Sequence, residues 1–256
     1  MKVTVLGCGS SVGTPAAGGY WGVCDPKNPK NHRSRASLLV SSATTDILID
    51  ATYDLRQQLN AIEQSKIDAV FLSHAHSDHI CGIDDLRVIS YHRGSPIPLY
   101  SNAATLEEFG GHFGYTFTGG YGGVYRPFLE KKTVAEDEKL TVGDIPLRLF
   151  PQDHGSCTSL GFRVNDFAYS VDVRDFSDAA LETLYGIDTW IIDCAGWRRE
   201  HSATHARLEQ IEDWIEKLKP RITYLTVLTN FMDYDALCKE LPDHIRPAYD
   251  GLVIEI

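Results

Sequence analysis

The chain has 256 residues, of which 43% are hydrophobic and 23% charged, and its formal net charge is −11. This composition excludes a disordered or fibrous protein and predicts one globular domain over residues 1–256. The acidic balance argues against general binding to nucleic acid, and no apolar run approaches the roughly 18 residues of a membrane span.

Neither the N-terminus nor the cysteines indicate secretion. The first apolar run is too soon interrupted for a signal peptide, so a cytoplasmic protein without a membrane partner is expected. The six cysteines are scattered without a CxxC pair, which predicts reduced thiols and no structural zinc knuckle.

Apolar periodicity predicts strands and helices in turn along the first half of the chain. The predicted strands cover residues 3–7, 37–49, 67–72 and 96–100. The predicted helices cover residues 53–62, 84–91 and 103–109. A long Gly/Pro-rich loop runs from residue 9 to about residue 35.

Residues 110–123 contain seven glycines and four aromatic residues and are predicted to form a mobile loop. The aromatic side chains could stack on a base or sugar, pack on their own loop, or join two copies in a homodimer. They are Phe113, Tyr115, Phe117 and Tyr121.

The second half repeats the order of strands followed by helices. Strands are predicted at 126–134, 139–150, 159–164, 167–171, 189–193, 222–228 and 252–256, and helices at 181–185, 204–218 and 234–240. Two β-rich halves with helices predict an α/β fold, an αββα sandwich of two mixed β-sheets flanked by helices.

The most informative motif, residues 74–79, directly follows the apolar run of the 67–72 strand. Its ligand-type residues are His74, His76, Asp78 and His79. Imidazole nitrogens and a carboxylate suit a divalent cation. If the segment is extended, alternate side chains face one way, and four donors packed this densely could serve two metals.

The motif has the HxHxDH form of the metallo-β-lactamase superfamily, which the chain resembles over nearly its whole length. Residues 6–11, 21–26 and 29–35, with Ile49-Asp50 and residues 54–56, are similar to one branch of that superfamily. The branch comprises phosphoribosyl 1,2-cyclic phosphate phosphodiesterases of phosphonate metabolism. The resemblance implies a metallo-β-lactamase fold and a metal-dependent hydrolase.

The resemblance also implies two divalent metals, zinc or manganese with iron as a third candidate. His74, His76 and His154 would hold the first metal, Asp78 and His79 the second, and Asp172 would bridge them. Asp78 is also expected to take part in catalysis. The superfamily has one more histidine at the end of a late strand, where this chain has Val227. A valine has no lone pair, so the second site would be weakened, completed by another group, or absent.

A phosphodiesterase of this kind uses a metal-bound hydroxide as nucleophile and needs a proton for its leaving group. The resemblance favours His205 as general acid, while His201 could contact substrate. Alternatively, the residues around both histidines simply begin the 204–218 helix, with Ser202 or Thr204 as its cap. Arg33 and Arg35, in the one basic cluster of the chain, could bind phosphate or belong to a solvated loop.

The predicted function is hydrolysis of a small cyclic phosphate or nucleotide-like phosphodiester, with a small phosphorylated molecule as the partner. A lactone, thioester or β-lactam hydrolase of the same fold is the first alternative. The second alternative is a metal- or nucleotide-binding protein whose catalysis is weakened by Val227. A tRNA-processing nuclease fits the net charge less well.

Overall fold

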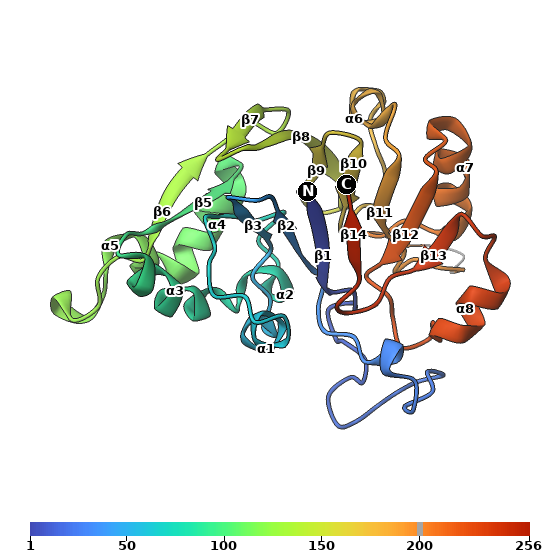
Figure 1. Ribbon diagram of the computed structural model, residues 1–256, viewed down its shortest axis with the longest axis horizontal. Coiled ribbons are helices and arrows are strands. Elements are labelled where there is room, and N and C mark those ends of the chain that lie inside the picture. Colours follow the sequence, from blue (N-terminus) through green and yellow to red (C-terminus); the bar gives the residue numbers. More distant parts are fainter. Residues whose placement is uncertain (199–201) are drawn as a thin grey trace.

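Two seven-stranded mixed sheets pack face to face in the computed structural model, which describes residues 1–198 and 202–256 (Figure 1). The first sheet contains, in spatial order, β14 (Val253–Glu255), β1 (Lys2–Gly7), β2 (Ser37–Ser41), β3 (Asp46–Ile49), β4 (Ala69–Phe71), β5 (Ile97–Ser101) and β6 (Leu129–Thr133). The second contains β13 (Ile245–Pro247), β12 (Ile222–Thr226), β11 (Thr189–Asp193), β10 (Phe167–Ser170), β9 (Thr158–Val164), β8 (Ile145–Asp153) and β7 (Lys139–Val142).

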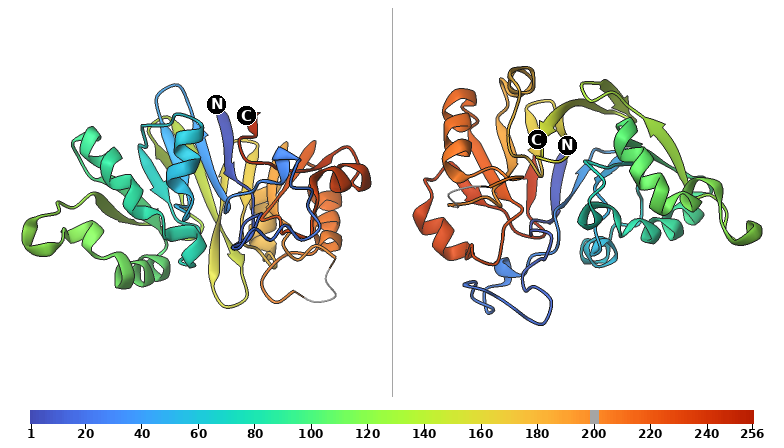
Figure 2. Two further views of the ribbon diagram at one scale, coloured as in Figure 1. Left: turned by 90° about the horizontal axis from the view of Figure 1, so that it is seen from below. Right: turned by 180° about the vertical axis from the view of Figure 1, so that it is seen from behind.

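Helices cover the outer faces of both sheets, which completes the predicted αββα sandwich (Figures 1 and 2). The first half contains α1 (Leu55–Ala61), α2 (Ser77–Ile80), α3 (Leu86–Arg93), α4 (Ala103–Phe113) and α5 (Tyr115–Thr118). The second half contains α6 (Asp178–Leu184), α7 (Leu208–Leu218) and α8 (Tyr234–Glu240). Short 3-10 turns lie at Pro29–Asn31, Ile83–Asp85 and Tyr121–Gly123. Among the helices of the described residues, none combines the length and apolar character that spanning a bilayer requires.

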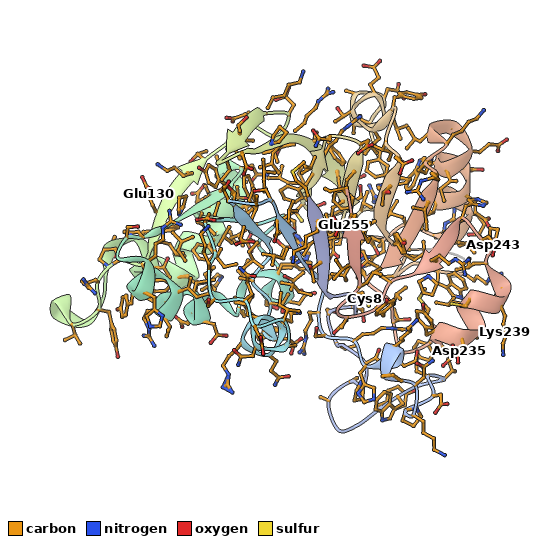
Figure 3. All side chains as sticks on the ribbon, in the orientation of Figure 1. Cys8, Glu130, Asp235, Lys239, Asp243 and Glu255 are labelled. Carbon is orange, nitrogen blue, oxygen red and sulfur yellow. The ribbon has the colours of Figure 1, made fainter. Side chains whose placement is uncertain are left out.

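Alternation along the strands explains the layers. In β2, Leu38 belongs to the apolar cluster between the sheets, whereas Leu39 joins the cluster beneath α1, α3 and α4. The rings of Phe71 in β4 and Phe162 in β9 meet across the interface, with centroids 5.8 Å apart. Figure 3 shows this interior filled by side chains, with Cys8 inside it and Glu130 at the far edge.

Several predicted elements have different boundaries in the structure. The predicted strand 37–49 is a hairpin, because the Ser42 hydroxyl accepts hydrogen bonds from Thr44 N (3.1 Å) and Thr45 N (2.9 Å) and closes a turn. The predicted strand 139–150 is split at Gly143, whose φ of +59° suits a tight turn. The strand β13 was not predicted.

The predicted loop 110–123 is largely helical, which corrects the prediction. The helix α4 continues through two glycines to Phe113, because the ring of Phe109 stacks on that of Phe113 at 5.2 Å and meets that of Phe117 at 5.6 Å. Tyr115 donates a hydrogen bond from its hydroxyl to Asp84 (2.9 Å). Of the interpretations of these aromatic residues, packing on their own segment agrees with the contacts of Phe113 and Phe117.

Candidate metal centre

The site lies where the parallel strands of both sheets end. The strands β3, β4 and β5 are parallel, and so are β10, β11 and β12. Parallel strands bring their carboxyl ends to one edge, where ligands of α/β proteins usually bind. Asp50 and His74 follow β3 and β4, Asp172 follows β10, and Asp193 ends β11. His154 directly follows β8, which reaches the same region from the neighbouring hairpin.

The histidine motif differs from the extended loop that was predicted. His76 has an extended backbone (φ −63°, ψ 146°) and precedes α2, so Asp78 and His79 lie in the first turn of a helix. The helix turns Asp78 and His79 away from the direction of a continued strand. The predicted extended backbone is therefore found in this motif only as far as His76.

Four of the predicted ligands converge into one cluster. His74, His76, His154 and Asp172 each offer a donor atom, and these atoms lie within 4.8 Å of one another. His154 Nε2 is 3.3 Å from both His76 Nδ1 and Asp172 Oδ2, and His74 Nε2 is 3.6 Å from Asp172 Oδ2. His74, His154 and Asp172 are buried, whereas His76 is partly exposed.

The donor set fits a divalent cation. His74 Nε2 and Asp172 Oδ1 are buried without a hydrogen-bond partner, which costs free energy unless another group satisfies them. Burial, the largest cause, lowers the pKa of both His74 and His154, so these rings favour the neutral form that binds metals. Three imidazoles and a carboxylate are the usual ligands of zinc and related ions.

Outer hydrogen bonds set the tautomers of the buried rings. Ser73 donates its hydroxyl proton to Asp50 Oδ2 (2.8 Å), so it accepts from His74 Nδ1 (3.0 Å) and leaves a lone pair on His74 Nε2. His154 donates from Nδ1 to the Thr204 carbonyl (2.7 Å). Both rings therefore turn an unprotonated Nε2 toward the cluster, as metal-binding histidines do.

His79 and Asp78 lie at the edge of this cluster. His79 Nε2 is 3.4 Å from both Asp78 Oδ2 and Asp172 Oδ2, and its Nδ1 contacts Asp50 Oδ2 at 2.7 Å. Burial lowers the pKa of His79, but the Asp172 and Asp50 carboxylates outweigh burial and raise it well above the usual value. Within the described residues, neither Asp78 nor His79 joins a group of three or more converging donors.

His205 lies beside the cluster and is held by Asp193. The rings of His205 and His154 have centroids 5.1 Å apart. Asp193 Oδ2 accepts from His205 Nδ1 (2.7 Å) and from Val173 N (3.0 Å), and Oδ1 accepts from Ala195 N (2.8 Å). Burial lowers the pKa of His205, but Asp193 and then Asp172 raise it to about 9. The ring is therefore a protonated donor at neutral pH.

The predicted substrate contacts have other partners in the structure. Arg33 is buried and donates to Asn31 Oδ1 (3.0 Å) and the Thr229 carbonyl (3.2 Å). Arg35 forms an ion pair with Asp54 at 3.1 Å. These contacts hold the N-terminal loop, and a role in substrate binding stays a prediction. His201 lies outside the described residues.

Sequence reasoning missed two carboxylates that position the histidines, Asp50 and Asp193. Each lies at the end of a buried strand and is itself fully buried, where an unpaired charge would be costly. The available signal was an aspartate directly after apolar residues, in Ile49-Asp50 and Ile192-Asp193. Such a signal is weak without the tertiary contacts.

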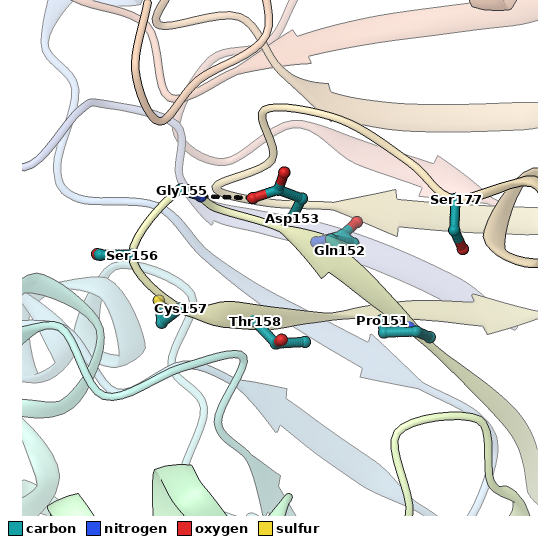
Figure 4. A pocket seen from close by; sticks show the side chains of 8 residues that line it. All are labelled: Pro151, Gln152, Asp153, Gly155, Ser156, Cys157, Thr158 and Ser177. Atoms are coloured by element: carbon teal, nitrogen blue, oxygen red, sulfur yellow. Dashed lines mark hydrogen bonds between the residues drawn. The ribbon is translucent and has the colours of Figure 1, made fainter.

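A pocket of about 410 Å³ lies against the hairpin that carries His154 (Figure 4). Asp153 shapes the turn of this hairpin, because its Oδ1 accepts a hydrogen bond from Gly155 N at 2.7 Å. The pocket is lined mainly by uncharged polar residues. The lining comprises Pro151, Gln152, Asp153, Gly155, Ser156, Cys157, Thr158 and Ser177.

We expect Asp50→Asn to lower metal affinity by about 10–100-fold, as loss of an outer hydrogen-bond partner usually does. The amide cannot accept the three bonds from Ser73 N, Ser73 Oγ and His79 Nδ1 that Asp50 receives. Competition with a chromophoric chelator measures the change. Asp46→Asn, at the other end of β3, is the matched control, and equal affinity of Asp50→Asn and the control would contradict the role of Asp50.

Paired mixed sheets with a His/Asp cluster at the strand ends are the arrangement of the metallo-β-lactamase fold. The sequence profile of the β-lactamase superfamily domain matches residues 45–226. The chain therefore belongs to the β-lactamase superfamily, and the predicted family and fold are confirmed.

Among solved structures, the chain is similar to a diphosphatase of the PhnP family. The two share 32% sequence identity and a TM-score of 0.89, over 100% of this chain and 96% of that chain.

Two curated relatives are longer proteins. An octanoyltransferase of Porphyromonas gingivalis is 33% identical over 98% of this chain and 51% of its own length. A ribonuclease Z of Mycolicibacterium gilvum is 25% identical over 67% of this chain and 59% of its own length. The chain thus spans about half to three fifths of these relatives.

Proposed function

We propose that residues 1–256 form one metal-dependent hydrolase domain that cleaves a small phosphodiester. The observation that carries this proposal is the convergence of His74, His76, His154 and Asp172 next to His205. A cation acting on a phosphoryl group needs a proton donor for the leaving oxygen beside it. The likeness to a PhnP-family diphosphatase supports a phosphorus-centred reaction over a lactone, thioester or β-lactam.

His74, His76, His154 and Asp172 would hold the metal, with zinc and manganese as the first candidates. The cation supplies Lewis acidity, which activates water and offsets the negative charge of the phosphoryl oxygens. The protein supplies the proton transfers. Asp78 accepts a proton from the attacking water as the new P–O bond forms. His205 gives its Nε2 proton to the departing oxygen as the old P–O bond breaks, which leaves a phosphomonoester and an alcohol.

The electrostatics support these two roles. The pKa of Asp78 is lowered, because the His79 hydrogen bond and charge outweigh the opposing effect of burial, so the carboxylate is ionised and can accept a proton. The pKa of His205 is raised to about 9, so the ring holds a proton at neutral pH. The two groups have opposite protonation states at the same pH, as a base and an acid of one reaction require.

The test compares substrates on protein reconstituted with zinc or manganese. We expect turnover of bis(p-nitrophenyl) phosphate and of 5-phosphoribosyl 1,2-cyclic phosphate. A dinucleoside diphosphate is tested as a third substrate, because the similar solved structure is a diphosphatase. Lactone, thioester and β-lactam substrates are measured in parallel. Fast turnover of one of these without any phosphoester cleavage would reverse the proposal, and no turnover at all would favour a binding protein.

A further inference from the structure

Three residues at strand ends have a left-handed backbone: Asp50 (φ 65°), Asp172 (φ 48°) and Val227 (φ 56°). Aspartate enters this conformation readily, because its short polar side chain can bond to the local backbone. A β-branched residue there is an outlier that persists only when its surroundings impose it. Two of these positions supply carboxylates to the site, and the third supplies a valine.

The surroundings do impose the conformation of Val227. On its N-terminal side, Cys194 N donates to the Thr226 carbonyl at 3.0 Å. On its C-terminal side, Leu228 N donates to the Cys8 carbonyl at 2.7 Å, and the Leu228 carbonyl accepts from Ser10 N at 3.1 Å. The backbone is therefore held on both sides, independently of the side chain that this position carries.

The position lies at the edge of the site. The strands β11 and β12 are parallel with Asp193 opposite Thr226. Val227 therefore directly follows the residue that pairs with Asp193, whose carboxylate holds His205. Val227 is only 3% exposed. Its side chain belongs to the apolar cluster between the sheets, and a valine has no lone pair to offer a cation.

Among residues 1–198 and 202–256, the donors available for a second cation are therefore few. His79 Nε2 lies 3.4 Å from Asp78 Oδ2 and 3.4 Å from Asp172 Oδ2. Of the first cluster, Asp172 is thus the ligand that a cation at Asp78 and His79 would share. Asp172, Asp193 and His205 form a second group of donors within 4.8 Å of one another, but there the oxygens of Asp193 already accept hydrogen bonds from Val173 N, Ala195 N and His205. The first position, by contrast, has four converging donors.

We propose that the chain binds one divalent cation tightly, at His74, His76, His154 and Asp172, and that Val227 prevents tight binding of a second at Asp78 and His79. The loss of an outer-shell partner already costs about 10–100-fold in affinity, and a missing direct ligand costs no less. A second equivalent should thus bind at least about 10-fold more weakly than the first. The inference rests on the proposed metal centre but not on any substrate.

The experiment titrates metal-free protein with Co²⁺ by absorbance and calorimetry, and counts zinc atoms per chain after gel filtration of zinc-loaded protein. We expect one tight equivalent for the unaltered chain and two for Val227→His, since histidine supplies the missing nitrogen. The control is Val227→Asn, which also suits a left-handed backbone but offers only a weak amide donor, and it should keep one equivalent.

Two tight equivalents in the unaltered chain would overturn the proposal, whether or not the variants fold. One equivalent in both the unaltered chain and a folded Val227→His protein would contradict the role of Val227. Because binding is counted without turnover, a chain that binds one cation but cleaves no phosphodiester would refute the proposed function alone.

Discussion

Replacing His76 by alanine should abolish phosphodiester hydrolysis, with a loss of at least about 10³-fold in kcat/KM. This exceeds the 10–100-fold that an outer-shell partner contributes, because His76 would be a direct ligand. The change suits this position because His76 is partly exposed and, although it precedes α2, its side chain forms no capping hydrogen bond. The fold should therefore persist while one of the four donors is lost.

Metal content and turnover are measured together on the same preparation. We expect His76→Ala to lose tightly bound metal in parallel with activity, and an unchanged circular dichroism spectrum to show that it is folded. His92→Ala removes an exposed histidine of α3 and should change neither quantity. Full activity of folded His76→Ala would exclude the cluster as the catalytic centre.

Replacing His205 by alanine should lower kcat by about 10²–10⁴-fold on a substrate with an alkoxide leaving group, the usual contribution of a general acid. The loss should be much smaller on bis(p-nitrophenyl) phosphate, because p-nitrophenolate leaves without a proton. A residue with only a structural role would affect both substrates equally. Equal losses on the two substrates would therefore assign His205 a structural role instead.

The pH profile tests the same assignment through Asp193. A general acid works while it is protonated, so activity should be present below the pKa of His205 and be lost as pH rises through it. Burial lowers that pKa, but Asp193 and Asp172 raise it to about 9. A cation bound at Asp172 offsets part of this increase, so the alkaline limb should lie at or below about pH 9.

Asp193→Asn removes the main charge that raises the pKa of His205, so the alkaline limb should move to lower pH. The profile of kcat for the alkoxide substrate is the readout. Asp188→Asn is the control, because Asp188 directly precedes the opposite end of β11 and pairs with the exposed Arg221. A limb that stays in place in Asp193→Asn would contradict the pairing with His205.

Local sequence was sufficient to predict most of the layers and the six-residue histidine motif. Alternating apolar residues predicted the buried strands, because each faces either the second sheet or the helices. The histidine motif was visible because its donors lie within six residues, and His154, Asp172 and Val227 followed from the resemblance. The predicted element boundaries were wrong where a side chain closes a turn, as Ser42 does, and where aromatic packing extends a helix, as at Phe109.

By itself, the sequence determined the superfamily, the αββα layers and the residues from which a metal centre could be built. The layers depend on residue types and short-range periodicity, which one chain displays directly. The superfamily and the ligands beyond the histidine motif followed from the resemblance of its motifs. Only the tertiary structure decided how those residues are held. Asp50 contacts His79 across 29 positions, His154 contacts Thr204 across 50, and the backbone beside Val227 is held by Cys8 from the opposite end of the chain. Such contacts follow from how the strands assemble, so they cannot be predicted from a local sequence pattern.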